Sequence, residues 1–192
     1  MKKKLLIAAL LVIAVSILAV GTAAYNSSRA YTHSVITSGG VSIELQETML
    51  GSDGKTEVAY KDPGKLVPGQ HFSKIVRVKN LDAEAFVRVK VELVATKDNE
   101  VLDTALLTLD YDTENWTLKD GWYYYNKPLA AKEAAAGQVT TALFEEVALA
   151  GENMKNTWQG AAVSIKVTPQ AVQKANNGEN PLTAPGWSEF KS

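Results

Sequence analysis

The stretch that decides the fold is Ala85–Ala95, with the sequence AFVRVKVELVA. Apolar residues recur at every second position, an alternation that is typical of a β-strand with one buried face. The apolar face would carry Ala85, Val87, Val89, Val91, Leu93 and Ala95. The opposite face would carry Arg88, Lys90 and Glu92, with Phe86 and Val94 as apolar exceptions. This charged face is expected to meet water, as in antiparallel sheets that are covered on one side only.

The preceding segment, Phe72–Lys79, is rich in β-branched residues and is predicted to form a second strand. Between the two segments lies Asn80–Asp82, which has the composition of a turn. Two strands joined by a short turn predict an antiparallel hairpin made of Phe72–Lys79 and Ala85–Ala95.

Val35–Leu45 also alternates and predicts one strand, inside which Gly39 and Gly40 indicate either a bulge or a close approach of another backbone segment. One face of this strand would carry Val35, Thr37, Gly39, Val41, Ile43 and Leu45, with Ile36 out of place. A later segment, Ala161–Val167, alternates in the same way. Pro169 either ends this later strand or places it at the edge of a sheet, because proline cannot donate to a central ladder.

Trp116–Tyr125 predicts a tight hairpin with Asp120 and Gly121 as its loop, the composition that favours a type I′ turn. One face of the hairpin would then collect Trp116, Leu118, Tyr123 and Tyr125. An aromatic stripe of this kind is expected to pack in the core rather than to bind a ligand. If the other face is exposed, Trp122 and Tyr124 are its natural binding platform.

Six to eight short strands separated by turn signals, with little helix, predict an all-β antiparallel sandwich. The interpretation of Leu102–Leu109 stays open between a short helical turn and a strand. Leu129–Ala136 is rich in helix formers and predicts a short surface helix. Asn176–Ser192 has few apolar residues and is interpreted as a tail, which leaves residues 39–175 as the sandwich domain.

The N-terminus has the three parts of a secretory signal peptide. The basic residues Lys2–Lys4 precede the apolar run Leu5–Val20, and Gly21–Ala24 supplies small side chains. Cleavage between Ala24 and Tyr25 is therefore expected. The alternative is an uncleaved signal-anchor helix, for which the run is a little short, since spanning a bilayer takes roughly 17–25 residues.

Composition narrows the function further. The chain has a net charge of −1, and loss of residues 1–24 with their three lysines would leave a mature protein of charge −4. A mildly acidic chain without a basic run argues against nucleic acid as a partner. The chain has no cysteine, so an exported form would depend on its core alone. We expect a secreted protein that contacts the membrane only through the uncleaved signal.

No catalytic constellation stands out. The two histidines, His33 and His71, lie far apart, whereas zinc hydrolases commonly use two histidines at helical spacing. No Gly-x-Ser-x-Gly elbow and no phosphate-binding glycine loop occurs. A glycosidase carboxylate pair stays open because the chain has 21 acidic residues. We expect no enzyme activity, no cofactor and no catalytic metal, and favour a structural or binding role.

Asp110–Glu114 places three carboxylates on one side of a possible strand. Hard oxygen ligands of this kind could form a weak calcium site. The spacing does not match an EF-hand loop, so a solvated acidic face is the favoured interpretation.

Several segments taken together resemble one known family. They are the signal Lys2–Tyr25, the strand Val35–Leu45, Val67-Pro68-Gly69 followed by Val76–Asn80, Ala85–Val89, and Asp120–Tyr125 followed by Pro128-Leu129. In order and spacing these segments resemble the TasA/CalY (camelysin) family of Gram-positive bacteria, over most of the chain. The resemblance implies a jelly-roll sandwich, a signal that a SipW-type signal peptidase cuts, and a major protein of the extracellular fibres in biofilm matrix.

Subunits of that family join by donor-strand exchange, in which the N-terminal segment of one subunit completes the sheet of the next. By resemblance the donor would fall in residues 25–38, with Tyr25, Tyr31, Val35 and Ile36 as the donor residues. The implied partners are further copies of the chain in a fibre, the signal peptidase and an accessory matrix protein.

Two other functions are kept as alternatives. One is a surface module that binds carbohydrate or protein through Trp122 and Tyr124. The other is an atypical metallopeptidase, since some camelysins have been classed as such. The chain has no recognisable zinc motif, so this activity is not carried over.

Overall fold

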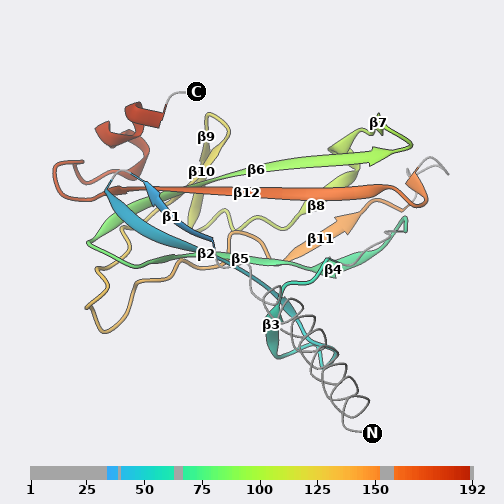
Figure 1. Ribbon diagram of the computed structural model, residues 1–192, viewed down its shortest axis with the longest axis horizontal. Helices are drawn as coiled ribbons and strands as arrows, with labels where there is room; N and C mark the ends of the chain where they lie inside the picture. Colours follow the sequence, from blue (N-terminus) through green and yellow to red (C-terminus); the bar gives the residue numbers. More distant parts are fainter. Residues whose placement is uncertain (1–33, 39, 63–66, 152–157, 191–192) are drawn as a thin grey trace, which may run out of the picture. The chain divides into compact units, whose positions relative to one another are not determined.

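The computed structural model describes residues 34–38, 40–62, 67–151 and 158–190 (Figure 1). For residues 34–38 and 188–190 it describes the backbone only. The signal peptide, the cleavage site at Ala24 and Tyr25, and the donor residue Tyr31 lie outside these residues. The described part is all-β and antiparallel, with short 3-10 helices only, so the predicted fold class is confirmed at this level.

One layer is built around strand β2. Its strands are β1 (Ser34–Ser38), β2 (Val41–Leu50), β3 (Glu57–Ala59) and β5 (Ile75–Asn80), followed by β4 (His71–Ser73), β11 (Glu146–Leu149) and β8 (Leu107–Leu109). The two groups are joined edge to edge, because Val76 N–H donates to Phe144 O and Leu143 N–H donates to Val76 O. Residues 138–149 therefore continue the ladder that β2 and β5 begin.

A second layer contains the two longest strands. Its strands are β12 (Ala162–Gln173), β6 (Ala85–Lys97), β10 (Trp122–Tyr125) and β9 (Trp116–Lys119), in that order, with β7 (Glu100–Val101) paired to the end of β6. Figure 1 shows β6 and β12 side by side along most of their length. The 3-10 helices are η1 (Thr104–Leu106), η3 (Pro181–Thr183) and η4 (Pro185–Phe190).

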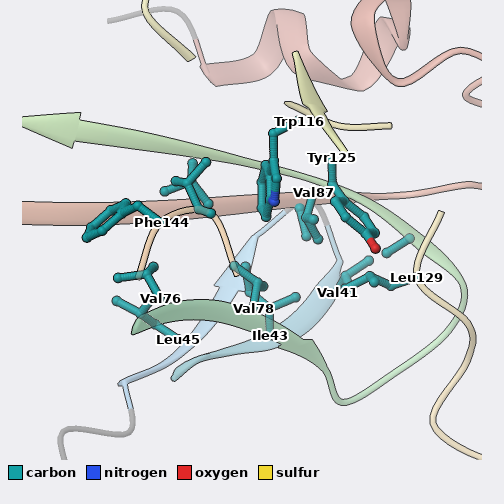
Figure 2. Packing of buried hydrophobic residues seen from close by; sticks show 14 of the residues in the cluster. Val41, Ile43, Leu45, Val76, Val78, Val87, Trp116, Tyr125, Leu129 and Phe144 are labelled. Carbon is teal, nitrogen blue, oxygen red and sulfur yellow. The ribbon is translucent and has the colours of Figure 1, made fainter. Parts of the chain in front are cut away.

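The main core lies between the two layers (Figure 2). Its buried members include Val41, Ile43, Leu45, Val76, Val78, Val87, Val89, Trp116, Tyr125, Leu143, Phe144 and Val147. Full burial of a side chain of this size stabilises a fold by about 1.5–3 kcal/mol. Since the chain has no cysteine, this packing carries the stability that disulfides supply in many exported proteins.

The expected hairpin of Phe72–Lys79 with Ala85–Ala95 is wrong. The first segment divides into β4 and β5, and β5 pairs with β2, whereas β6 pairs with β12 and β10. Both edges of β5 are already occupied, by β2 and by residues 138–144, so the chain must cross to the other layer. The buried Asn80 holds this corner: its Nδ2 donates to Ala83 O at 2.7 Å and to Ala130 O at 2.9 Å.

The expected bulge at Gly39 and Gly40 is also wrong. Ser38 pairs with Val41, so β1 and β2 form an antiparallel hairpin, and Gly40 turns the chain with a φ of 75°. A glycine suits this position because a left-handed backbone conformation is unfavourable for other residues. The turn changes the register, so that Ile36, not Val35, is opposite the buried Ile43.

The Trp116–Tyr125 hairpin is confirmed in its full register, from Lys119 opposite Trp122 to Trp116 opposite Tyr125. Asp120 and Gly121 have φ values of 51° and 76°, as a type I′ turn requires. Trp116 and Tyr125 on one face of the hairpin are buried, as expected. Leu118 on the same face is 58% exposed, because β9 is the edge strand of its sheet.

Other expectations had mixed outcomes. Leu102–Leu109 contains both alternatives, η1 followed by β8. Leu129–Ala136 forms turns and bends rather than a helix, because Leu129 is drawn into the core and bridges to Ala85. Pro169 does not end its strand, because β12 continues to Gln173. β12 is the edge strand of its sheet, as the second alternative for Pro169 predicted.

We predict that Phe144→Ala lowers the free energy of unfolding by about 3–5 kcal/mol, because the ring is fully buried and its removal leaves a cavity. Chemical denaturation followed by fluorescence would measure the change. Leu118→Ala, at an exposed position, is the matched control and should change stability by less than about 0.5 kcal/mol. Equal losses in the two variants would contradict this assignment of the core.

Candidate functional site

The candidate assembly site is the edge of β2 on which β1 lies. β1 is antiparallel to residues 41–45 of β2, with Val35 opposite Glu44 and Ile36 opposite Ile43. Of the expected donor residues, these two lie in β1, and Tyr25 and Tyr31 lie outside the described residues. The segment expected to pair with another subunit thus pairs with its own chain here.

The slot that β1 occupies is bounded at one end by β3. β5 pairs with Ile43–Thr48 of β2, which overlaps the stretches that pair with β1 and with β3. β1 and β3 must therefore follow one another along the opposite edge of β2, since a strand has only two edges. The Glu47 carbonyl accepts from Tyr60 N–H just beyond β3 and closes that end of the slot.

A side chain of the other layer contacts the β1–β2 turn at Gly40. Gln173, the last residue of β12, donates from Nε2 to the Gly40 carbonyl at 3.3 Å. A single exposed hydrogen bond of this kind contributes about 0.5–1.5 kcal/mol. Among the described residues, the positive φ of Gly40 and this hydrogen bond from Gln173 both favour the turn.

Trp122 and Tyr124 do not form the exposed platform expected from the sequence. Tyr124 is only 4% exposed, and Trp122 is half-buried. The guanidinium of Arg88 lies over the Trp122 ring, 4.2 Å from its centre. The guanidinium donates to Gln170 Oε1 from Nε and Nη2, and to the Tyr124 hydroxyl from Nη1.

Arg88 also contradicts the expected solvent exposure of its strand face. Lys90 and Glu92 lie at the surface as expected, in an ion pair of 3.5 Å, but Arg88 is only 6% exposed. Its guanidinium is covered on the second side by Trp187, whose ring centre is 4.5 Å away. Stacking between two indole faces stabilises a cation that would otherwise be costly to bury.

Trp187 comes from the segment that was expected to be a tail. η3 and η4 fold it back onto the outer face of β6 and β10, where Ala184 and Trp187 join Phe86, Tyr124 and Val172 in a second cluster. Asn177 Oδ1 accepts from Gly186 N–H at 2.7 Å and fixes the return. The sequence signal was Trp187 itself, since a lone tryptophan among polar residues is expected to find a partner surface.

The acidic stretch Asp110–Glu114 holds loops together rather than forming a free acidic face. Asp110 Oδ1 accepts from the N–H groups of Glu145 and Glu146. Asp112 accepts from Asn115 and from the Thr141 hydroxyl, the latter at 2.9 Å. Desolvation alone would raise the pKa of Asp112, but the hydrogen bonds from Asn115 and Thr141 outweigh it and hold the pKa below its usual value.

A buried ion pair lies at the end of the core, beside a cavity of about 130 Å³. Lys74 Nζ contacts Glu47 Oε1 at 2.5 Å and lies 3.7 Å from the centre of the Tyr60 ring. Burial raises the pKa of Tyr60 well above its usual value, and Asp62 and Glu47 add to the effect. The ion pair gives Lys74 a partner of opposite charge, which this lysine needs because it is almost fully inaccessible to solvent.

Histidine is not gathered into a metal centre in the described residues. His71 pairs through Nδ1 with Glu146 at 2.9 Å, both side chains being more than half exposed, and His33 lies outside the described part. Within residues 34–38, 40–62, 67–151 and 158–190, no group of three His, Cys, Asp or Glu side chains is placed to hold a metal ion. In the same part of the chain, none of the helices has the length and apolar character needed to cross a membrane.

Comparison with known proteins gives no relative. No protein-family model, no curated protein and no solved structure matches the chain.

We predict that Arg88→Ala lowers the free energy of unfolding by about 2–4 kcal/mol, because it leaves Tyr124 and Gln170 without their partner and removes the stacking on Trp122 and Trp187. Tryptophan fluorescence should shift as the rings become solvated. Lys90→Ala, at the exposed position two residues along β6, should cost less than about 1 kcal/mol. Equal effects would show that the cluster contributes no stability of its own.

We predict that Asp112→Asn flattens the acid side of the curve of melting temperature against pH. Because the folded pKa of Asp112 is lowered, its carboxylate contributes stability above the usual value of 3.8, and this is lost as the pH falls through the folded pKa. Calorimetry between about pH 5 and 2 would compare the two proteins. Parallel curves over this range would contradict the prediction.

Proposed function

We propose that this protein is a secreted structural subunit of extracellular matrix fibres, assembled by exchange of its N-terminal strand between copies. The observation that carries the proposal is the position of β1, a short strand at the edge of its layer that is joined to β2 through Gly40. The motif resemblance to the TasA/CalY family supports the same role. A jelly-roll order of strands and removal of the signal by a SipW-type peptidase belong to this proposal.

The physical chemistry of strand exchange fits this edge. Removing β1 would leave a row of backbone N–H and C=O groups on β2 without partners, and another extended strand can satisfy that row. If each copy donates to the next without closing a ring, the product is a filament. An uncleaved signal would tether the donor segment to the membrane, so that cleavage acts as the switch for assembly.

The binding-module alternative is less favoured by the geometry. An exposed aromatic platform was its basis, and Tyr124 is buried beneath Arg88 and Trp187. The metallopeptidase alternative has no observation in its favour among the described residues.

The proposal predicts that purified residues 25–192 form fibres and that residues 39–192, which lack β1, stay monomeric. Negative-stain microscopy and sedimentation at matched concentrations would measure both. Circular dichroism of the shorter chain is the control for folding. Monomers from both chains would contradict the proposal and favour a binding module or an accessory subunit.

A further inference from the structure

We propose that Lys74 and Glu47 are the site of an intramolecular amide bond, formed when the two side chains condense in the folded protein and release one water molecule. The bond would join β2 to the residue between β4 and β5. It would give a chain without cysteine a covalent link between its strands. This modification goes beyond the assembly of copies proposed above and does not depend on it.

The amine and the carboxyl group lie in contact inside the protein. Lys74 Nζ is 2.5 Å from Glu47 Oε1, and the two side chains are 4% and 15% exposed. Since a carbon–oxygen bond of this kind is about 1.2 Å long, the nitrogen lies at most about 3.7 Å from the carboxyl carbon. Reacting atoms in productive complexes are about 3–3.5 Å apart. The pair is therefore held close to the geometry from which the nitrogen attacks the carbon.

The surroundings of the pair favour a neutral amide over two ions. The Tyr60 ring lies 3.7 Å from Lys74 Nζ, and Phe72 lines the same cavity as the lysine. Aromatic surface, rather than bulk water, therefore lies beside the ammonium group. Taking two ions out of water is costly even when they are paired, whereas an amide carries no charge. The hydration that opposes condensation of an amine with an acid in water is largely missing here.

The reaction balances without a cofactor or an oxidant. Transfer of one proton from the Lys74 ammonium to the Glu47 carboxylate gives an amine and a carboxylic acid. The nitrogen then attacks Cδ of Glu47, the C–N bond forms, and the C–O bond to the hydroxyl group breaks. One proton of the nitrogen leaves with this hydroxyl group as water. Asp62 lines the cavity beside Lys74 and can carry that proton, and the cavity of about 130 Å³ has room for the water released.

The link would lie where the two groups of strands in this layer meet. Glu47 is opposite Val76 in the pairing of β2 with β5. The N–H of Lys74 donates to the Glu145 carbonyl, next to the first residue of β11. The two cross-linked residues are 27 positions apart in the chain. A covalent bond between them would restrict the unfolded chain and thereby stabilise the fold, as a disulfide does.

Mass spectrometry of the denatured full chain tests the bond directly. The protein should weigh one water molecule less than its sequence predicts. Tryptic digestion should give a branched peptide in which residues 30–55 are joined to residues 66–77 through Glu47 and Lys74. A protein with the full mass of its sequence, and with these peptides separate, would overturn the proposal.

Variants assign the two partners. Glu47→Gln should lose ammonia instead of water and give the same branched peptide, because a carboxamide and an amine condense to the same amide. Lys74→Arg should keep the mass that its sequence predicts, since a guanidinium stays protonated and does not attack a carboxyl group.

The matched control for burial is Glu179→Ala. Lys174 and Glu179 also form an ion pair, at 2.9 Å, but their side chains are 20% and 88% exposed. This variant should therefore still lose one water molecule. Loss of water that persists in Lys74→Arg, or that disappears in Glu179→Ala, would overturn the assignment of the bond to the buried pair.

Discussion

The structure depends on β2 satisfying three demands at once. Its alternate side chains fill the core between the layers, one edge pairs with β5, and the other edge must find partners for its backbone groups along its whole length. β1 and β3 together meet the last demand. Because unpaired backbone groups over a buried face are costly, the N-terminal segment is recruited to the fold although it contributes few residues to it.

The alternation of apolar residues and the composition of the turns predicted where the strands lie better than which strands pair with each other. The Trp116–Tyr125 hairpin was predicted residue by residue, because Asp120 and Gly121 determine both the turn type and the register. The β5–β6 connection was not predicted, because a short polar link can join two strands of one sheet or lead the chain from one sheet to another sheet. Only the burial of Asn80 and the occupied edges of β5 distinguish these outcomes, and both are properties of the folded chain.

The errors at Gly40 and Arg88 have different physical origins. Two glycines in an alternating run are compatible with a bulge as well as with a turn. The local sequence does not indicate that Ser38 pairs with Val41, which is what distinguishes the turn. Arg88 was placed in water because it alternates with Lys90 and Glu92. Its burial depends on Trp187, 99 positions further along the chain, so no local pattern could show it. The pairing of β1 with β2 of the same chain was therefore not predicted from the sequence.

Exchange of β1 between copies would replace contacts with identical contacts, so the pairing itself supplies little net driving force. Within one chain the hairpin also has the advantage of proximity, because its two strands are joined by a two-residue turn. A stable filament must therefore gain free energy from something that the closed chain lacks. Relief of the left-handed backbone conformation at Gly40 is one such source. The balance between a monomer whose β1 pairs within its own chain and a filament would then be set outside β1, with the backbone conformation of Gly40 as one contribution.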